Sequence, residues 1–227
     1  LHLGDAIAGF APACGALACQ LKSGRSLPAD LVVLAIGVRP ETALAKAAGL
    51  ALGPRGHIRT DAFLRTDDPD IYAAGDAAEI RDFVTDEPTA VPLGGPANRQ
   101  GRAIADHIFR PASARPIPGA LGTAIVRAFT VTAGLTGWSE KRLRAAGRTY
   151  RTVTVNGNHH ADYYPGTQPI ILKLLWDPAD GRILGAQASG LAGIDKRLDT
   201  LATAIAGHLT IDDLAQLELS YAPPFGS

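Results

Sequence analysis

The chain has 227 residues, 46% of them hydrophobic, and its 22 basic side chains balance 22 acidic ones. A formal net charge of zero gives no support for nucleic-acid binding or a polybasic membrane surface, and no apolar run is long enough to cross a bilayer. Two cysteines are too few for a disulfide framework, so we expect a reducing cytoplasm. The chain lacks methionine and opens inside an apparent strand, which favours the carboxyl-terminal piece of a longer protein.

Residues 1–37 are predicted to form short strands, with a turn at 22–25. The last strand, 31–36, is apolar throughout and includes two β-branched valines and an isoleucine. This pattern is typical of a strand that is covered on both faces. No GxGxxG motif follows a strand anywhere in the chain, so neither dinucleotide-binding βαβ unit is complete.

The next segment, residues 38–112, begins with a predicted helix over 41–48 that Gly49 ends. An extended stretch at 58–64 precedes a turn and a short strand at 71–74, which breaks at Gly75 and Asp76. Glycine lets a ligand approach the backbone, and aspartate offers acceptors for ligand hydroxyls at the carboxyl end of a strand. An aspartate that caps a turn is the alternative interpretation.

A second helix is predicted over 97–109, with Pro96 in its first turn. Its small residues Ala97, Gly101 and Ala105 fall on one face and permit close packing. The free N–H groups and the positive dipole end of such a helix stabilise negative charge. The alternative is an ordinary small-residue helix packed on a sheet.

Residues 113–227 follow a proline-rich linker and alternate between strand and helix signals. Strands are predicted near 123–132, 150–156, 170–176 and 182–188, and helices at 139–146, at 194–205 and after Thr210. The sequence DPADG at 177–181 is a strong hairpin signal between two of the strands. The pattern predicts an α+β domain with an antiparallel sheet.

Three motifs occur in an order and spacing that the chain shares with one family: YAAGD at 72–76, GPANRQGR at 95–102 and YAPPF at 221–225. Over essentially its whole length the chain resembles the pyridine nucleotide-disulfide oxidoreductases. The resemblance implies an α/β remnant, with the end of an NAD(P)H-binding domain at 1–37 and the second segment of an FAD-binding domain at 38–112. A carboxyl-terminal α+β dimerisation domain would occupy 113–227.

The resemblance also implies the cofactors FAD and NAD(P)H and the residues that meet them. Asp76, with Gly75, corresponds to the family's contact with the ribityl chain of FAD. Leu93 and Ala97 lie at the start of the helix whose amino end faces the flavin pyrimidine ring. Gly37 ends the run ADLVVLAIG, which resembles the last strand of the NAD(P)H-binding domain.

The YAPPF motif resembles the coenzyme A-disulfide reductase branch, which includes NADH oxidases, NADH peroxidases and persulfide reductases. In that branch two tyrosines enter the partner subunit's active site beside a single catalytic cysteine, which implies catalytic roles for Tyr163 and Tyr221. The choice of Tyr163 over Tyr164 is nearly even. A pair of aromatic interface anchors is the alternative. No histidine precedes a proline, which disfavours the two-cysteine enzymes.

Further polar clusters have two interpretations each. Lys196 and Arg197 lie in a segment that resembles the branch's GADKRID sequence and would meet coenzyme A phosphates. A basic pair on a solvated helix face is an equally good interpretation of these two residues. The pair His159-His160 is predicted to lie in a solvated loop, with no metal. Cys14 and Cys19 have the C-x4-C spacing of the redox disulfide in glutathione-reductase-type enzymes. That disulfide follows the amino-terminal FAD fingerprint, whereas these two cysteines lie in the nucleotide domain, so we expect structural cysteines.

The resemblance therefore implies a homodimeric flavoenzyme that passes hydride from NAD(P)H through FAD to a cysteine-based disulfide, persulfide or peroxide. The catalytic cysteine is not in this sequence, and we expect these 227 residues alone to be inactive. An NADH oxidase that uses oxygen on the same frame is one rival hypothesis. A non-catalytic dimerisation module without flavin is the other.

Overall fold

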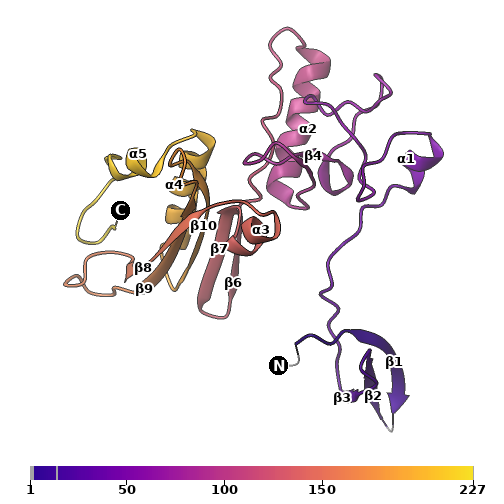
Figure 1. The fold of residues 1–227 in the computed structure, drawn as a ribbon, viewed down its shortest axis with the longest axis horizontal. Helices are drawn as coiled ribbons and strands as arrows, with labels where there is room; N and C mark the ends of the chain where they lie inside the picture. The colour runs from indigo at the N-terminus through magenta and orange to yellow at the C-terminus, as the bar shows by residue number, and fades with distance from the viewer. Residues whose placement is uncertain (1–2, 14, 227) are drawn as a thin grey trace. The chain divides into compact units, whose positions relative to one another are not determined.

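The computed structural model describes residues 3–13 and 15–226, and the chain divides into two compact units, Leu1–Arg39 and Pro40–Ser227 (Figure 1). The first unit is an antiparallel sheet in the order β1-β2-β3, with bounds β1 (Ile7–Ala13), β2 (Ala16–Leu21) and β3 (Ser26–Ala29). The predicted turn joins β2 to β3, where the Leu21 amide donates to the Arg25 carbonyl at 2.8 Å. Cys19 is buried in β2, as expected of a structural cysteine, whereas Cys14 lies outside the described residues.

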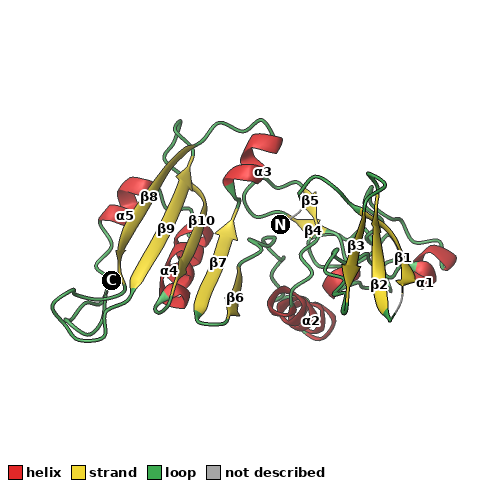
Figure 2. Ribbon diagram, turned by 90° about the horizontal axis from the view of Figure 1, so that it is seen from below, coloured by secondary structure: helices red, strands yellow, loops and turns green. Residues whose placement is uncertain are grey.

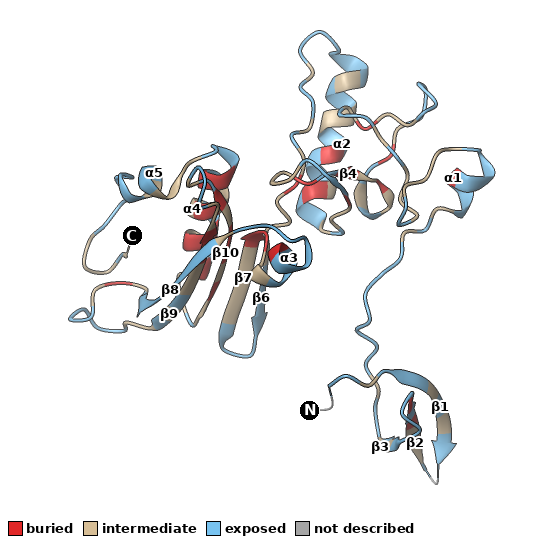
Figure 3. Ribbon diagram, viewed as in Figure 1, coloured by how far each residue is buried: buried red, intermediate tan, exposed pale blue. Residues whose placement is uncertain are grey.

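The predicted strand at 31–36 is not formed. Leu31, Val33, Leu34 and Ile36 are exposed, from 62% for Leu34 to 87% for Ile36, and this stretch runs as an extended chain in Figure 3. A strand requires a neighbour for its N–H and C=O groups, and no described residue pairs with this segment. The prediction of a strand covered on both faces is wrong for this structure, since nothing in the segment's own unit covers it.

The second unit begins with short elements that lead into a long helix. They are α1 (Ala43–Ala47), the 3-10 turn η1 (Gly75–Ala77), β4 (Ile80–Arg81), β5 (Pro88–Thr89) and α2 (Gly94–Phe109). α2 thus begins before the predicted start at residue 97, and Pro96 lies in its first turn as predicted. Leu64, Ile80 and Ala120 form a small core with Ile104 of α2.

The two extended stretches predicted here are shorter than expected. Residues 71–74 form only one bridge, between Tyr72 and Arg65, and 58–64 turns at Asp61. The Asp61 carboxylate accepts from the amides of Phe63 at 2.8 Å and Arg65 at 3.0 Å. A side chain that accepts from two amides of a turn competes with strand pairing, which explains why the extended stretch is shorter than predicted.

The remainder of the second unit is a five-stranded antiparallel sheet in the order β6-β7-β10-β9-β8, with helices α3, α4 and α5 (Figure 2). The bounds are β6 (Ala124–Ala128), β7 (Val131–Gly137), α3 (Glu140–Ala145), β8 (Arg151–Asn158), β9 (Pro169–Trp176), β10 (Ile183–Gly190), α4 (Ile194–Ala206) and α5 (Ile211–Ala215). The predicted α+β class and antiparallel sheet are confirmed.

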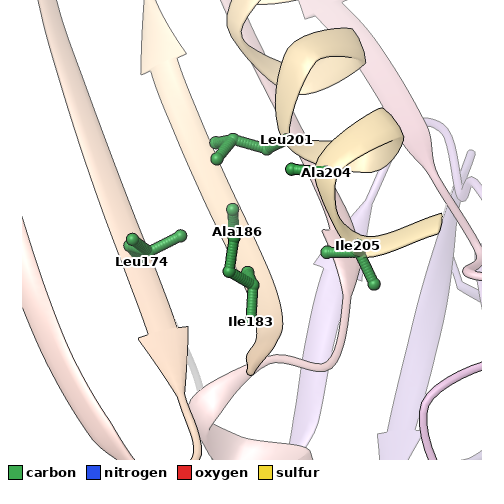
Figure 4. Packing of buried hydrophobic residues seen from close by; sticks show 6 residues of the cluster. All are labelled: Leu174, Ile183, Ala186, Leu201, Ala204 and Ile205. Carbon is green, nitrogen blue, oxygen red and sulfur yellow. The ribbon is translucent and has the colours of Figure 1, made fainter. Parts of the chain in front are cut away.

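Helix α4 lies across β7 and β10 and supplies the main core. Figure 4 shows Leu201, Ala204 and Ile205 of α4 facing Ala186 and its neighbours in the sheet. The predicted local signals are present: the hairpin at 177–181 joins β9 to β10, and Thr210 forms a capping box with Asp213. The apolar period of α4 leaves Asp195 and Asp199 exposed, whereas Arg197 is buried.

One buried carboxylate joins the two halves of the second unit. Asp82, 3% exposed, accepts from Trp138 Nε1 at 2.9 Å and from Arg142 Nη2 at 2.7 Å. The same carboxylate accepts from the amides of Val84 and Thr85, so a buried charge is satisfied from several directions.

Within the described part of the chain, no helix is long and apolar enough to cross a membrane.

Candidate functional site

The Gly-Asp pair lies where η1 meets the first turns of α2. Gly75 has a positive φ of 75°, and its amide donates to Gln100 Oε1 at 2.6 Å. A Cβ at Gly75 would lie 3.8 Å from the Cβ of Ala97, at ordinary van der Waals distance, so η1 and α2 are in direct contact. Asp76 is exposed, and its carboxylate accepts no hydrogen bond and forms no ion pair with any other described residue. It is therefore available to ligand hydroxyls.

The amino end of α2 is open. Leu93 has extended backbone, no side chain caps the helix, and Gly94 and Gly95 are exposed. The first N–H groups of a helix have no intrahelical partner, so these two glycine amides point toward any ligand at this end. The structure thus brings together four of the predicted cofactor residues, Gly75, Asp76, Leu93 and Ala97.

These residues fit a flavin nucleotide. The acceptors of Asp76 suit a polyhydroxy chain, and the uncapped amides of α2 suit an electronegative ring edge. An open groove of about 940 Å³ adjoins the same helix end, lined also by residues 118–125 and by residues of α4.

Gly37 belongs to the other unit, where it has a φ of 87° and no atom within 4 Å of the position that a Cβ would take.

Gln100 was missed by sequence reasoning. Its side chain is 3% exposed and fixes the Gly75 amide, so it determines how the Gly-Asp turn is presented. The available signal was its position four residues after Pro96, on the buried face of a helix otherwise rich in small residues. A glutamine on a packed face requires a polar partner.

The structure brings Tyr163 and Tyr221 together. Their hydroxyl groups form a hydrogen bond, which raises the pKa of Tyr163 above its ordinary value of 10.0. Both rings are exposed, at 77% and 61%. Tyr164 points elsewhere: its ring lies edge-on to His160, with centroids 5.6 Å apart. The geometry therefore favours Tyr163 over Tyr164 as the partner of Tyr221.

The loop that carries Tyr163 is held by a directed chain of hydrogen bonds. The Gln168 amide donates to His159 Nδ1 at 2.9 Å, and His159 Nε2 lies 2.8 Å from His160 Nδ1. Because His159 Nδ1 accepts, its Nε2 carries the proton and donates to His160. His160 Nε2 then donates to the Tyr164 carbonyl at 3.2 Å.

The prediction of a solvated loop is wrong for His160, which is 7% exposed. The physical reason is the hydrogen bond between the two imidazoles, which satisfies a ring nitrogen of His160 and so allows this ring to be buried. Within residues 3–13 and 15–226, no group of three or more His, Cys, Asp or Glu side chains is arranged to hold a metal ion.

The basic pair on α4 points toward the protein's own backbone. Lys196 Nζ donates to the Gly226 carbonyl at 2.6 Å and to the Ser220 carbonyl at 3.4 Å. Arg197 is 9% exposed, and its Nη2 donates to the His159 carbonyl at 2.8 Å. Burial lowers the pKa of the Arg197 guanidinium. The solvated-face alternative is therefore wrong for Arg197.

Comparison with known proteins agrees with this arrangement. Residues 1–101 match the family model of the pyridine nucleotide-disulphide oxidoreductases, and residues 123–227 match the model of that family's dimerisation domain. The chain belongs to this family. The predicted division into a nucleotide-binding part and a dimerisation domain follows the same order along the chain.

Three relatives illustrate the branch of the family. Coenzyme A disulfide reductase of Staphylococcus aureus is 34% identical over 90% of this chain and 46% of its own length. The reduced CoADR-RHD of Bacillus anthracis is 46% identical with a TM-score of 0.92, over 98% of this chain and 40% of that one. Water-forming NADH oxidase of Lactobacillus brevis is 29% identical with a TM-score of 0.91, over 98% of this chain and 48% of that one. The chain thus spans about half the length of these relatives.

Proposed function

We propose that the protein containing this chain is an NAD(P)H-dependent flavoenzyme that reduces a cysteine-based disulfide, persulfide or peroxide, with a coenzyme A-type disulfide as the leading substrate. The observation that carries the proposal is the hydrogen bond between two exposed tyrosines, Tyr163 and Tyr221. The likeness to the S. aureus and B. anthracis proteins supports the substrate class. The cysteine content remains the reason to expect a cytoplasmic location.

Asp76 and the amino end of α2 would hold FAD. The carboxylate would accept from ribityl hydroxyls, and the amides of Gly94 and Gly95 would donate to the electronegative edge of the ring. When bound, the flavin supplies the redox chemistry between the nicotinamide and the sulfur or peroxide substrate. Gln100 would hold the Gly-Asp turn in the conformation that presents Asp76, because its side chain accepts from the Gly75 amide.

The tyrosine pair would act on the substrate as hydrogen-bond donor and acid. The raised pKa of Tyr163 indicates that its hydroxyl donates to the Tyr221 oxygen, which leaves the Tyr221 hydroxyl free to donate to a substrate sulfur or a leaving thiolate. Tyr163 orients the Tyr221 hydroxyl through this hydrogen bond. Positioned acids of this kind typically contribute about 10²- to 10⁴-fold in rate.

The assembly would be a homodimer. The matched dimerisation domain supports this, and so do exposed apolar side chains on the outer strands of the sheet. They include Val126 on β6 and Val155 on β8, 64% and 52% exposed. Apolar surface of this kind is typical of a contact with another subunit. A tyrosine pair exposed on each dimerisation domain is then free to enter the partner's active site.

Oxygen reduction is the second candidate function, favoured by the likeness to the L. brevis oxidase. Anaerobic NADH and NADPH oxidation by the FAD-loaded full-length protein that contains this chain, with and without coenzyme A disulfide, separates the two. Our proposal requires disulfide-dependent turnover without oxygen. Turnover that needs oxygen alone would favour the oxidase, and a colourless protein that binds no FAD would leave only the dimerisation module.

A further inference from the structure

The amino end of α4 lies between the two segments that carry the tyrosines. Lys196 contacts the segment of Tyr221, and the adjacent Arg197 contacts the loop of Tyr163. We propose that Lys196 is a positioning residue, which holds residues 220–226 so that Tyr221 stays hydrogen-bonded to Tyr163, rather than a ligand of substrate phosphate. This inference rests on the proposed function for its catalytic consequence, while the positioning itself is a property of this chain.

The Tyr221 segment is a closed turn fixed at its base by Lys196. Ala222 and Phe225 exchange both backbone hydrogen bonds, at 3.1 and 2.7 Å, and two prolines between them restrict the backbone further. The carbonyls that Lys196 reaches, those of Ser220 and Gly226, lie on the two sides of this turn. A single ammonium group therefore fixes both ends of the segment.

The two tyrosine segments also touch through their backbones, at Gly226 and His159. A Cβ added to Gly226 would lie 2.2 Å from the His159 carbonyl oxygen and 2.5 Å from Arg197 Nη2. The tail backbone thus packs on the first residue of the Tyr163 loop, and Arg197 donates to that same carbonyl at 2.8 Å. Displacement of the tail would separate the tyrosines, because the loop is fixed independently by the histidine chain.

A phosphate ligand and a positioning residue make different predictions for substrates that differ only in their phosphates. Pantethine disulfide carries the same reactive disulfide as coenzyme A disulfide but lacks the nucleotide phosphates. The informative variant is Lys196→Met, which keeps the length of the side chain and removes its donors. Lys196→Arg restores the donors, and Lys141→Met serves as a control at an exposed lysine on α3.

We expect Lys196→Met to lower kcat roughly 10- to 100-fold with both disulfides, because displacement of about 1 Å is enough for such a loss. Lys196→Arg should recover most of the rate, and Lys141→Met should match the wild type. A rise in KM for coenzyme A disulfide alone, with pantethine disulfide unaffected, would overturn the proposal and assign Lys196 to phosphate binding.

Ultraviolet titration of the tyrosines tests the positioning without substrate. The difference between each protein and its Tyr163→Phe variant isolates Tyr163, whose pKa should fall toward 10.0 in Lys196→Met because the hydrogen bond that Tyr163 donates to Tyr221 is lost. An unchanged titration would overturn the proposal even if kcat falls. The kinetic variants are made in the full-length protein that contains this chain. If that wild-type protein reduces no disulfide, the proposed function fails, and the titration still decides the positioning role.

Discussion

The hydroxyl of Tyr163 is hydrogen-bonded to that of Tyr221, although the first lies in a loop between β8 and β9 and the second follows α5. Each belongs to a motif that the sequence had suggested separately. Their meeting within one chain means that a single protomer builds the complete tyrosine pair. A homodimer would then carry two such pairs, each assembled without help from the other subunit.

Removal of either hydroxyl of the pair should impair turnover. We expect Tyr163→Phe and Tyr221→Phe each to lower kcat by at least about tenfold, because positioned acids contribute about 10²- to 10⁴-fold. The double variant should lose little more than the worse single variant, since coupled residues are not additive. Steady-state kinetics with coenzyme A disulfide measures both effects.

Tyr164→Phe is the matched control for the pair. Its ring lies against His160 and its backbone carbonyl, rather than its hydroxyl, accepts the hydrogen bond. The variant should therefore keep the wild-type kcat. A loss of turnover in Tyr164→Phe, with Tyr163→Phe unaffected, would reverse the assignment of the two tyrosines.

Flavin affinity should depend on Asp76 and on Gln100. Asp76→Ala removes the carboxylate of the Gly-Asp turn, and Gln100→Leu leaves the partly buried Gly75 amide without its acceptor. We expect each change to weaken FAD binding roughly tenfold, which corresponds to one hydrogen bond to a charged or buried group. Flavin fluorescence titration measures the Kd.

Asp70→Ala is a suitable comparison, because Asp70 is an exposed carboxylate on the preceding turn. It should leave the Kd unchanged. If Asp76→Ala and Asp70→Ala bind FAD equally well, the carboxylate of Asp76 serves only its local turn.

Truncation of Asp82 should destabilise the whole second unit. The carboxylate is 3% exposed and accepts from Trp138, Arg142 and two backbone amides. Asp82→Ala leaves those donors unpaired, and we expect a loss of about 3 kcal/mol in the free energy of unfolding. Urea denaturation measures it, with Asp70→Ala as control. A loss no larger than that of the control would mean that the two halves are held by apolar packing alone.

Local signals in the sequence predicted most of the dimerisation domain. The apolar period of α4, the DPADG hairpin and the Thr210 capping box depend on residues close together in the chain, and all three are confirmed. The stretch at 31–36 failed as a strand because strand formation requires a partner that composition does not reveal.

The site residues show the same limit. Sequence alone favoured a solvent-facing or phosphate-binding role for Lys196 and Arg197, because both carry charge on a helix. Their partners, the carbonyls of Gly226 and His159, come from distant parts of the chain. A side chain's target can be predicted only when the fold that brings the target near is known, and Gln100 was missed for this reason.

Stability in acid should depend on Glu140. Hydrogen bonds from Lys173 and then from Tyr150 lower the pKa of its carboxyl from 4.5 to about 2. A depressed pKa means that the folded state favours the ionised form, so the stabilisation is complete above 4.5 and is lost as the pH falls toward about 2. The thermal midpoint of the wild type should therefore decline across this window more steeply than that of Glu140→Gln.

Glu140→Gln should also be less stable than the wild type near neutral pH, because the amide cannot replace the ion pair with Lys173. Thermal unfolding followed by circular dichroism at neutral pH and near pH 3 measures both effects. Glu218→Gln, at an exposed glutamate, should follow the wild type at both values. Parallel pH profiles for Glu140→Gln and the wild type would show that Lys173 and Tyr150 do not stabilise the carboxylate in solution.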